Sequence, residues 1–436
     1  MTDIIRAPHY AYSDEMKARF KREPEATVEA FSRRASAFSL LESLAANPVN
    51  PSLVSSTYGG IDAILMTLPG YVFSYSSYSD PISDLIGKLP SQCHLFILVS
   101  QNHRTILDTW LQNANATSRT TVVEAPTTMQ FTVWAEDAYA VVSDTAQSPA
   151  TRHLVEPATF RRAHDSLIAD EMAKGSSLNQ SQVQLYFQGG NLLIGDDFWL
   201  MGMDYAINSL NLGYVVPQAG ETELQAIERA YGEALDQQKK LILVGSSLAV
   251  PAQKEIPIVI NNEPWTEEVY AGNSPGTTQP LFHIDMFITL LGRSESGRQR
   301  ALVGDPKMAA DILGIPTSPY AMQSVFDDIA GKLEANGFEV ERNPLPLTYQ
   351  DDPSRKKRYW YFATANNALV QTSQGDEQVW IPTYGHGAWP ELSATDDANA
   401  QIWRNLGYTV NRLGDFHPFA FNLGAAHCIT KFLGRS

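Results

Sequence analysis

Residues 321–343, AMQSVFDDIAGKLEANGFEVERN, are the stretch from which the fold is most directly predicted. The first part predicts an amphipathic helix over Ala321–Asn336, because apolar residues recur there at helical spacing. These residues are Met322, Val325, Phe326, Ile329 and Leu333. Gly337 follows at once and favours the left-handed conformation that ends many helices. The next residues, FEVERN, predict a short strand, so a helix here leads into a strand.

The same order of elements recurs on both sides of this stretch. Further helices are predicted over His103–Ala114, Ala158–Lys174, Glu221–Gln238 and Asp397–Leu406. Apolar strands are predicted around them, over Thr120–Ala125, Phe131–Asp137, Gln184–Gly195, Lys240–Gly245, Pro280–Gly292, Arg358–Thr372 and His417–Phe432. We interpret this rhythm as five modules of strand, strand, helix and strand, which are repeated in architecture but hardly in sequence.

Five such modules arranged radially make a propeller-like α/β barrel, in which polar strand ends converge on one axial cleft. The alternative for alternating helices and strands is a doubly wound parallel sheet. No G-x-G-x-x-G follows a first strand, and several strands come in hairpin-like pairs, which favours the radial arrangement. Residues 57–436 are therefore predicted to form a single α/β domain. Residues 1–56, with the Ala-rich stretch Ala26–Asn47, are predicted to form a helical extension packed on that domain.

The composition restricts the kinds of partner that the protein can bind. Of the 436 residues, 44% are hydrophobic and 18% are charged, which excludes disorder as the dominant state. The net charge of −16 argues against nucleic acid, whose phosphates are bound by Lys and Arg. An acidic protein raises the local concentration of cations, so a small cationic substrate is favoured.

Cysteine content and hydropathy indicate the compartment. The two cysteines, Cys93 and Cys428, are too few for a disulfide framework or a four-cysteine zinc site. The N-terminal residues contain no signal peptide, and no stretch reaches the ~18 apolar residues needed to cross a bilayer. We therefore expect a cytoplasmic enzyme that does not bind membranes.

Several polar residues within these segments are candidates for a functional site. Cys428 follows small residues in GAAHC, which suits close approach to a ligand, although a buried structural cysteine has the same appearance. His283 and Asp285 are two positions apart on a predicted strand, so their side chains point to the same face. They are either a metal-binding pair, for which no further ligand is evident, or an exposed pair.

Three other segments carry similar candidates. Asp137 ends the predicted strand FTVWAED and is either functional or an ordinary turn aspartate. In FQGGN, Gly189 and Gly190 indicate a bulge or a close approach of the backbone to another group. Asn366 and Asn367 lie in an otherwise apolar strand, where buried amides need hydrogen-bond partners.

Taken in order along the chain, these segments resemble the motifs of a known group of enzymes. The motifs are Trp134-x-x-Asp137, Gly189-Gly190-Asn191, His283-x-Asp285, Asn367-x-Leu369 and the C-terminal GxxHCIT around Cys428. They resemble the guanidine-modifying (pentein) superfamily, and within it the branch of agmatine deiminase and bacterial peptidylarginine deiminase. The resemblance runs from about Trp134 to the C-terminus. It implies a pentein-type five-bladed α/β propeller of ββαβ modules with an N-terminal helical elaboration.

The resemblance also implies a role for each motif residue. Cys428 corresponds to the nucleophile, and His283 corresponds to the general acid and base. Asp137 and Asp285 correspond to the carboxylates that bind the guanidinium. Contacts with substrate are expected from Trp134, Gln188, Gly190, Asn191 and Asn367. The implied chemistry requires no metal ion and no cofactor.

The sequence departs from the pattern of agmatine deiminases at three places. Glu136 stands where those enzymes usually carry Arg, and the usual Gly-Pro after the aspartate is absent. Gln188 stands where they usually carry Glu, and Phe282 stands where they usually carry Gly before the histidine. The four residue types implied for the chemistry are retained, so the departures bear on the substrate's tail.

The implied reaction converts a guanidino group into a ureido group and ammonia through a covalent S-amidino intermediate on Cys428. The protein would thus be a deiminase, a hydrolase of C–N bonds in linear amidines. Two carboxylates suit a planar, cationic guanidinium because they accept its N–H groups in bidentate pairs. Arginine, agmatine, peptidyl-arginine and related guanidine compounds are all candidate substrates. Assembly as a homo-oligomer is left open.

Two alternatives belong to other functional classes. An amidinotransferase of the same superfamily would form the same intermediate and pass it to an amine in place of water. A non-catalytic pentein would keep the fold as a binding protein. Retention of Cys428, His283, Asp137 and Asp285 argues against the non-catalytic alternative.

Overall fold

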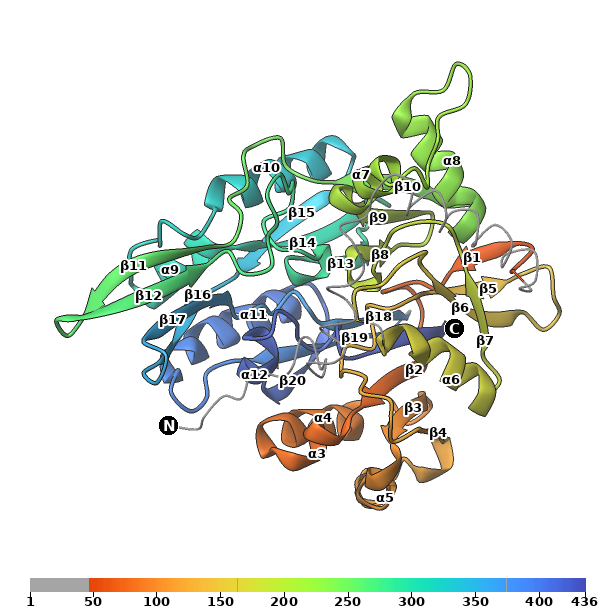
Figure 1. Ribbon diagram of the computed structural model, residues 1–436, viewed down its shortest axis with the longest axis horizontal. Coiled ribbons are helices and arrows are strands. Elements are labelled where there is room, and N and C mark those ends of the chain that lie inside the picture. The colour runs from red at the N-terminus through yellow and green to blue at the C-terminus, as the bar shows by residue number, and fades with distance from the viewer. Residues whose placement is uncertain (1–46, 163, 374) are drawn as a thin grey trace.

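The computed structural model describes residues 47–162, 164–373 and 375–436, which fold into a mixed α/β structure (Figure 1). Their strands form six sheets of three or four strands each. No sheet of the described residues contains five or more strands, so the alternative prediction of one doubly wound parallel sheet is wrong.

Five of the six sheets share one pattern, in which an antiparallel pair of strands is extended by a parallel strand. Their strands are β5 (Ala140–Asp144), β6 (Thr151–Glu156) and β7 (Asn179–Gln182); β8 (Leu192–Ile194), β9 (Phe198–Gly202) and β10 (Lys240–Val244); β13 (Ile288–Arg293), β14 (Gln299–Asp305) and β15 (Glu339–Pro344); β18 (Leu369–Ser373), β19 (Asp376–Thr383) and β20 (Thr409–Asp415); and β21 (Lys431–Arg435), β2 (Ile61–Leu68) and β3 (His94–Ser100). The pattern corresponds to the predicted order of strand, strand, helix and strand. The described sheets are open, and none closes into a barrel.

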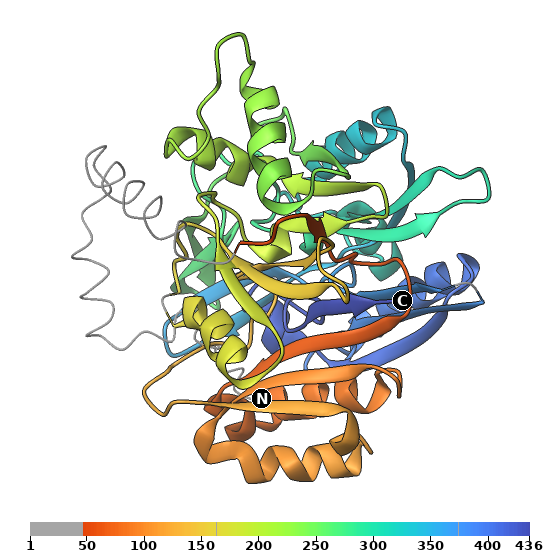
Figure 2. The ribbon, with the colours of Figure 1, turned by 90° about the vertical axis from the view of Figure 1, so that its right-hand side faces the viewer.

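The parallel strands are joined through helices. These are α3 (Gly70–Ser74) and α4 (Ser76–Lys88) before β3, α5 (Arg104–Asn113) before β4 (Thr120–Ala125), α6 (Ile168–Gly175) before β7, α7 (Met203–Asn211) and α8 (Glu223–Leu235) before β10, α9 (Pro306–Leu313) and α10 (Gln323–Ala335) before β15, and α11 (Ser393–Asn405) before β20. Figure 2 shows the sheet of β2, β3 and β4 with its helices at one end of the molecule and α8 at the other. A single helix turn, α12 (His417–Ala420), precedes β21.

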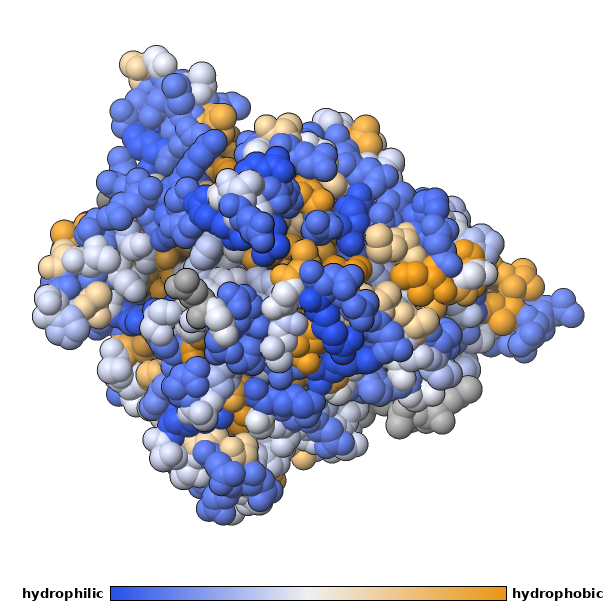
Figure 3. All heavy atoms as spheres, turned by 180° about the vertical axis from the view of Figure 1, so that it is seen from behind, coloured by the Kyte–Doolittle hydropathy of each residue, from blue (hydrophilic) through white to orange (hydrophobic). Residues whose placement is uncertain are grey.

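The sixth sheet forms an arm that the sequence rhythm did not predict. It contains β11 (Lys254–Ile260), β12 (Glu263–Val269), β16 (Leu347–Asp352) and β17 (Lys357–Phe362). The hairpin of β11 and β12 projects from the body of the molecule (Figure 1). Val259, near the tip of this hairpin, is 72% exposed. Apolar atoms are visible along the arm on the face opposite to that of Figure 1 (Figure 3).

Several predicted strands are only partly strand. Phe131–Asp137 contains no strand, and in three other predicted segments the strands are limited to β8, to β13, and to β17 and β18. The strand predicted over His417–Phe432 is wrong for most of its length, because His417–Ala420 forms the helix turn α12 and β21 begins only at Lys431. The prediction that His283 and Asp285 lie on one strand is wrong, because Ile284–Met286 forms a single 3₁₀ turn. The backbone amides of these segments bond to buried side chains in place of a neighbouring strand. Thr132 N, for example, donates to Asp165 Oδ1 at 2.7 Å.

The predicted helices are found with one shortened case. Helix α6 begins at Ile168, so the described residues 158–162 and 164–167 of the predicted helix Ala158–Lys174 are not α-helical. The helical extension predicted over residues 1–56 lies mostly outside the described residues. Its end, Pro51–Leu53, forms β1, which pairs with β5, so these three residues belong to a sheet and not to a helix.

Apolar side chains of these elements form several buried clusters. The largest packs β2 and β3 against α4 and α5 and includes Trp134 and Cys428. In the part of the chain that the structure describes, no helix combines the length and apolar character needed to cross a membrane.

Candidate active site

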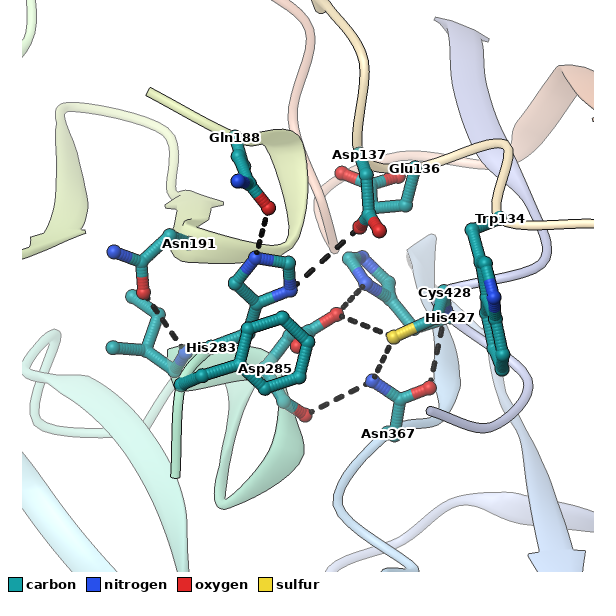
Figure 4. Close-up of polar contacts among 12 residues, drawn as sticks. Trp134, Glu136, Asp137, Gln188, Asn191, His283, Asp285, Asn367, His427 and Cys428 are labelled. Carbon is teal, nitrogen blue, oxygen red and sulfur yellow. Dashed lines mark hydrogen bonds and ion pairs between the residues drawn. The ribbon is translucent and has the colours of Figure 1, made fainter. Parts of the chain in front are cut away.

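The predicted site residues lie in short segments that directly precede the first strand of each repeated sheet. Trp134–Asp137 comes before β5, Gly189–Asn191 before β8, His283–Asp285 before β13, Asn367 before β18, and Cys428 before β21. The structure brings side chains from all five segments into one buried cluster (Figure 4). Residues up to 294 positions apart in sequence thus share one site.

Cys428 lies in this cluster and is only 2% exposed. Asn367 Nδ2 donates to its sulfur at 3.1 Å, and the thiol donates to Asp285 Oδ2 at 3.5 Å. Asn367 Oδ1 accepts the backbone N–H groups of Ala425 and Cys428, at 2.9 and 3.1 Å. Asn367 therefore both holds the segment that carries the cysteine and contacts the sulfur itself (Figure 4).

His283 is fully buried between an amide and a carboxylate. Its Nε2 donates to Gln188 Oε1 at 2.8 Å, and its Nδ1 lies 3.6 Å from Asp137 Oδ1. The ring of Phe282 stacks on it with 3.9 Å between centroids. Gly190 passes so close that an added Cβ would lie 2.5 Å from His283 Nδ1. Gln188 and Gly190 therefore both contact the histidine, and their contact with substrate stays a prediction.

Asp285 has a partner that sequence reasoning missed. His427 Nδ1 donates to Asp285 Oδ2 at 2.8 Å, and this is the same oxygen that faces the sulfur of Cys428. Asp285 Oδ1 and His427 Nε2 are buried without a hydrogen-bond partner among the described residues. The position of His427, next to the candidate nucleophile, was the one sequence signal that pointed to it.

Asp137 already pairs with a guanidinium that belongs to the protein. Arg162 Nη2 donates to Asp137 Oδ2 at 2.7 Å, while Arg162 Nε donates to Asp165 Oδ2 at 2.5 Å. Asp137 Oδ1 is buried and has no hydrogen-bond partner among the described residues. One oxygen of Asp137 thus stays directed at the cluster, near His283. No motif around Arg162 indicated this pairing.

Trp134 and Asn191 are buried and contact the backbone of segments that carry site residues. Asn191 is fully buried, and its Oδ1 accepts the backbone N–H of Ile284 at 3.1 Å and an N–H of Gln279 at 2.9 Å. Trp134 is buried against Gly424, where an added Cβ would lie 2.3 Å from the indole. Both residues fix segments of the site. A cleft of about 790 Å³ lies beside the cluster, and neither Asn191 nor Trp134 lines it.

Glu136, one of the departures from the deiminase pattern, forms a buried ion pair. Its Oε1 accepts from Lys431 Nζ at 2.6 Å, and both side chains are buried. Its backbone N–H donates to the carbonyl of Cys428 at 3.1 Å. Burial raises the pKa of Glu136, although Lys431 and His427 act in the opposite direction.

The electrostatic surroundings favour a neutral thiol and a neutral imidazole before a substrate binds. Burial raises the pKa of Cys428 well above its ordinary value, and the carboxylates of Asp285 and Asp137 raise it further. Burial lowers the pKa of His283, and the same two carboxylates offset only part of that effect. A bound cation would reverse the effect of the carboxylates on the thiol.

Two residues that contact His283 line the cleft beside the cluster, namely Gln188 and Phe282. Other walls come from Arg162, Tyr186, Tyr205 and Phe421. None of the four residues predicted for the chemistry lines the cleft itself, so the cleft lies next to the cluster through Gln188 and Phe282. Within the described residues, no group of three or more His, Cys, Asp and Glu side chains is arranged to hold a metal ion.

Comparison with known proteins identifies the fold. No protein family model and no curated protein matches the sequence. A structural-genomics target assigned as an agmatine deiminase superposes with a TM-score of 0.58 and 10% identity, over 88% of this chain and 95% of the target. A C. jejuni agmatine deiminase variant with substrate bound gives 0.56 and 10%, over 88% and 97%. The Enterococcus faecalis agmatine deiminase gives 0.54 and 13%, over 88% and 95%.

These similarities show the fold of the chain, which is the fold of the solved agmatine deiminases. The resemblance predicted from the order of the motifs is therefore confirmed for the fold.

Proposed function

We propose that this protein is a cysteine hydrolase that converts a guanidino group into a ureido group and ammonia. One observation carries the proposal: Cys428, His283, Asp137 and Asp285 meet in one buried cluster beside a cleft. The carboxylates supply negative charge and acceptors for a planar cation. The fold shared with agmatine deiminases supports the same reaction class.

In the first step, the bound guanidinium brings a positive charge next to the sulfur of Cys428. That charge lowers the pKa of the thiol, and the thiolate attacks the central carbon of the guanidinium. A tetrahedral intermediate forms, and its C–N bond breaks. His283, which is neutral before substrate binds, takes up the proton released by the thiol and passes it to the leaving ammonia. The remaining amidino group stays bound to sulfur.

In the second step, His283 takes a proton from a water molecule that attacks the same carbon. The C–S bond then breaks, the thiolate leaves, and a ureido group is released. The overall balance is one guanidinium and one water giving one ureido compound and one ammonium ion. Arginine, agmatine and peptidyl-arginine all carry the reacting group, so each is a candidate substrate.

We also propose that the five repeated sheets correspond to the five blades of a pentein propeller. The site residues support this assignment, because each segment precedes the first strand of one sheet. Residues 57–436 would then form the catalytic domain. A cytoplasmic location, the absence of a metal ion or cofactor, and the lack of nucleic-acid and membrane partners stay predictions from the sequence.

The test is to incubate the protein with arginine, agmatine and an arginyl peptide in oxygen-18 water and to measure ureido product and ammonia. We expect labelled ureido oxygen and one ammonia per turnover with at least one of these compounds. Cys428→Ser is expected to be inactive. Cys93→Ser is the matched control, because Cys93 is also buried and its thiol contacts the carbonyl of His94 and none of the site residues.

The same experiment, run with excess glycine, separates hydrolysis from amidino transfer. Amidinated glycine together with an unlabelled amine product would show that the protein is an amidinotransferase and not a hydrolase. Absence of turnover with every guanidine compound, in a folded protein, would favour the non-catalytic alternative.

A further inference from the structure

A buried ion pair lies directly behind the candidate nucleophile. Glu136 Oε1 accepts from Lys431 Nζ at 2.6 Å, and the two side chains are 5% and 8% exposed. Glu136 precedes Asp137, and Lys431 follows Cys428 by three residues. The backbone N–H of Glu136 also donates to the carbonyl of Cys428. The pair is thus attached to two segments that carry site residues.

Between this pair and the sulfur lies His427. It is 4% exposed, and its Nδ1 donates to Asp285 Oδ2 at 2.8 Å. That oxygen lies 3.5 Å from the sulfur of Cys428. The imidazole and the thiol therefore share one carboxylate oxygen (Figure 4). A displaced imidazole would release this oxygen.

The buried charges around the site are unbalanced if His427 is neutral. Four buried carboxylates, Asp137, Asp165, Asp285 and Glu136, face two buried cations, Arg162 and Lys431. Uncompensated buried charge is costly. An imidazolium at His427 leaves one excess negative charge, which a guanidinium cation would neutralise.

We propose that His427 is a positioning residue: as an imidazolium it donates from Nδ1 to Asp285 and fixes that carboxylate beside the sulfur of Cys428, and the excess of buried carboxylates around the site favours this protonated form. His427 acts through Asp285. The expected effect of His427 on turnover rests on the proposed function. Glu136 and Lys431 support His427 from the side opposite to Cys428. The Glu136 that departs from the deiminase pattern is thereby assigned to this support and not to substrate binding.

The two carboxylates near His427 favour its charged form, while Lys431 and His283 oppose it. Burial alone would lower its pKa, but Glu136 and Asp285 outweigh burial and raise the pKa of His427, while Lys431 opposes them. His283 also interacts unfavourably with a charged His427. Cys428 completes the surroundings through the shared Asp285 oxygen. The nearest other ring is that of Phe432, 5.9 Å away between centroids.

The experiment compares Glu136→Gln/Lys431→Met and His427→Gln with the unmodified protein. The first readout is the titration of His427 by NMR, for which we expect a protonated ring at pH 7 in the unmodified protein and a lower pKa in the double variant. The second readout is alkylation of Cys428 by iodoacetamide at pH 8. We expect its rate constant to fall about tenfold in both variants, as a shift of about one pKa unit requires.

The matched control is Asp236→Asn/Lys239→Met. This pair is also largely buried, with Lys239 Nζ 2.7 Å from Asp236 Oδ2, and it lies outside the site. The control variant measures how much the loss of a buried ion pair changes the thermal midpoint of unfolding. The control should leave the titration of His427 and the alkylation of Cys428 unchanged. If the Glu136/Lys431 variant fails to fold, His427→Gln alone carries the test.

A neutral His427 at pH 7 in the unmodified protein, or unchanged alkylation of Cys428 in folded variants, would overturn the inference. Neither readout uses a substrate. The inference can therefore fail while guanidine turnover is observed, and the proposed function can fail while His427 titrates as expected.

Discussion

At His283 the chain provides an amide partner on one side of the ring and a carboxylate on the other. Gln188 Oε1 accepts from Nε2 at 2.8 Å, and the Asp137 oxygen near Nδ1 is more distant, at 3.6 Å. An amide does not stabilise the imidazolium as a carboxylate does. Because burial lowers the pKa of His283, its ring stays neutral to lower pH than an ordinary histidine.

Replacing Gln188 by Glu should raise the pKa of His283. A carboxylate at hydrogen-bond distance favours the imidazolium, and such contacts shift a pKa by about 1–3 units. The pKa is measured by NMR titration of the His283 ring, and the pH dependence of kcat/KM should move upward with it. Gln401→Glu on the exposed side of α11 is the control and should leave both unchanged. An unshifted His283 in folded Gln188→Glu protein would contradict the assignment of Gln188.

At the scale of elements, two short turns place the histidine. Gly189–Asn191 and Ile284–Met286 are single 3₁₀ turns that pack together. Asn191 Oδ1 accepts the N–H of Ile284, so a side chain of one turn satisfies the backbone of the other. The close contact requires a residue without Cβ at position 190, as the 2.5 Å approach to His283 shows.

Gly190→Ala should therefore displace His283 and lower kcat/KM about a hundredfold, as expected for a shift of about 1 Å in a reacting group. The control is Gly331→Ala in α10, where an added Cβ meets nothing within 4 Å. This substitution should leave activity unchanged and add up to about 1 kcal/mol of stability, because Ala favours helix over Gly. Unchanged kcat/KM in Gly190→Ala would show that the turn tolerates the extra atom.

Strand β6 contains a buried carboxyl that makes stability depend on pH. Burial raises the pKa of Glu156 to about 8, and its Oε2 accepts from Gln180 Nε2 at 2.6 Å. The folded chain thus holds a proton that the unfolded chain releases above its ordinary pKa of about 4.3. The contribution of Glu156 to stability therefore falls as pH rises from about 4.3 toward 8.

Glu156→Gln removes this titration while keeping a side chain of similar size. The thermal midpoint of the variant minus that of the unmodified protein should increase steadily between pH 5 and pH 8. Differential scanning calorimetry at several pH values measures it. A difference that is constant over this range would show that Glu156 is ionised in the folded protein.

For the whole molecule, the net charge of −16 and the excess of buried carboxylates act in the same direction. Both attract a cation toward the cleft. Arg162 and Lys431 offset two of the four buried carboxylates, and the charge that remains is negative. The acidic chain and the site thus favour the same class of substrate.

The value of kcat/KM for a guanidinium substrate should therefore fall as salt is added. The screening length decreases from about 30 Å at 0.01 M to about 3 Å at 1 M ionic strength, which weakens long-range attraction. Alkylation of Cys428 by neutral iodoacetamide is the control and should change little over the same range. A kcat/KM that is independent of salt would show that the overall charge does not steer the substrate.

The sequence by itself determined the elements whose signals are local. Apolar spacing and a terminal glycine predicted Ala321–Asn336, and the structure contains α10 at Gln323–Ala335. The strand predicted over Thr120–Ala125 is β4 with the same bounds. The order of the motifs also predicted the likeness to the fold of agmatine deiminases, which the solved structures confirm, while the five-bladed arrangement stays a proposal.

Only the tertiary structure decided which side chains meet and which backbone is irregular. His427 and Asp285 are 142 positions apart, Arg162 and Asp137 are 25 apart, and Lys431 and Glu136 are 295 apart. No periodicity links such residues, so their pairing depends on how the sheets pack. The same packing brings buried amides and carboxylates to backbone N–H groups, and segments that are apolar enough for strands become the turns that hold the site.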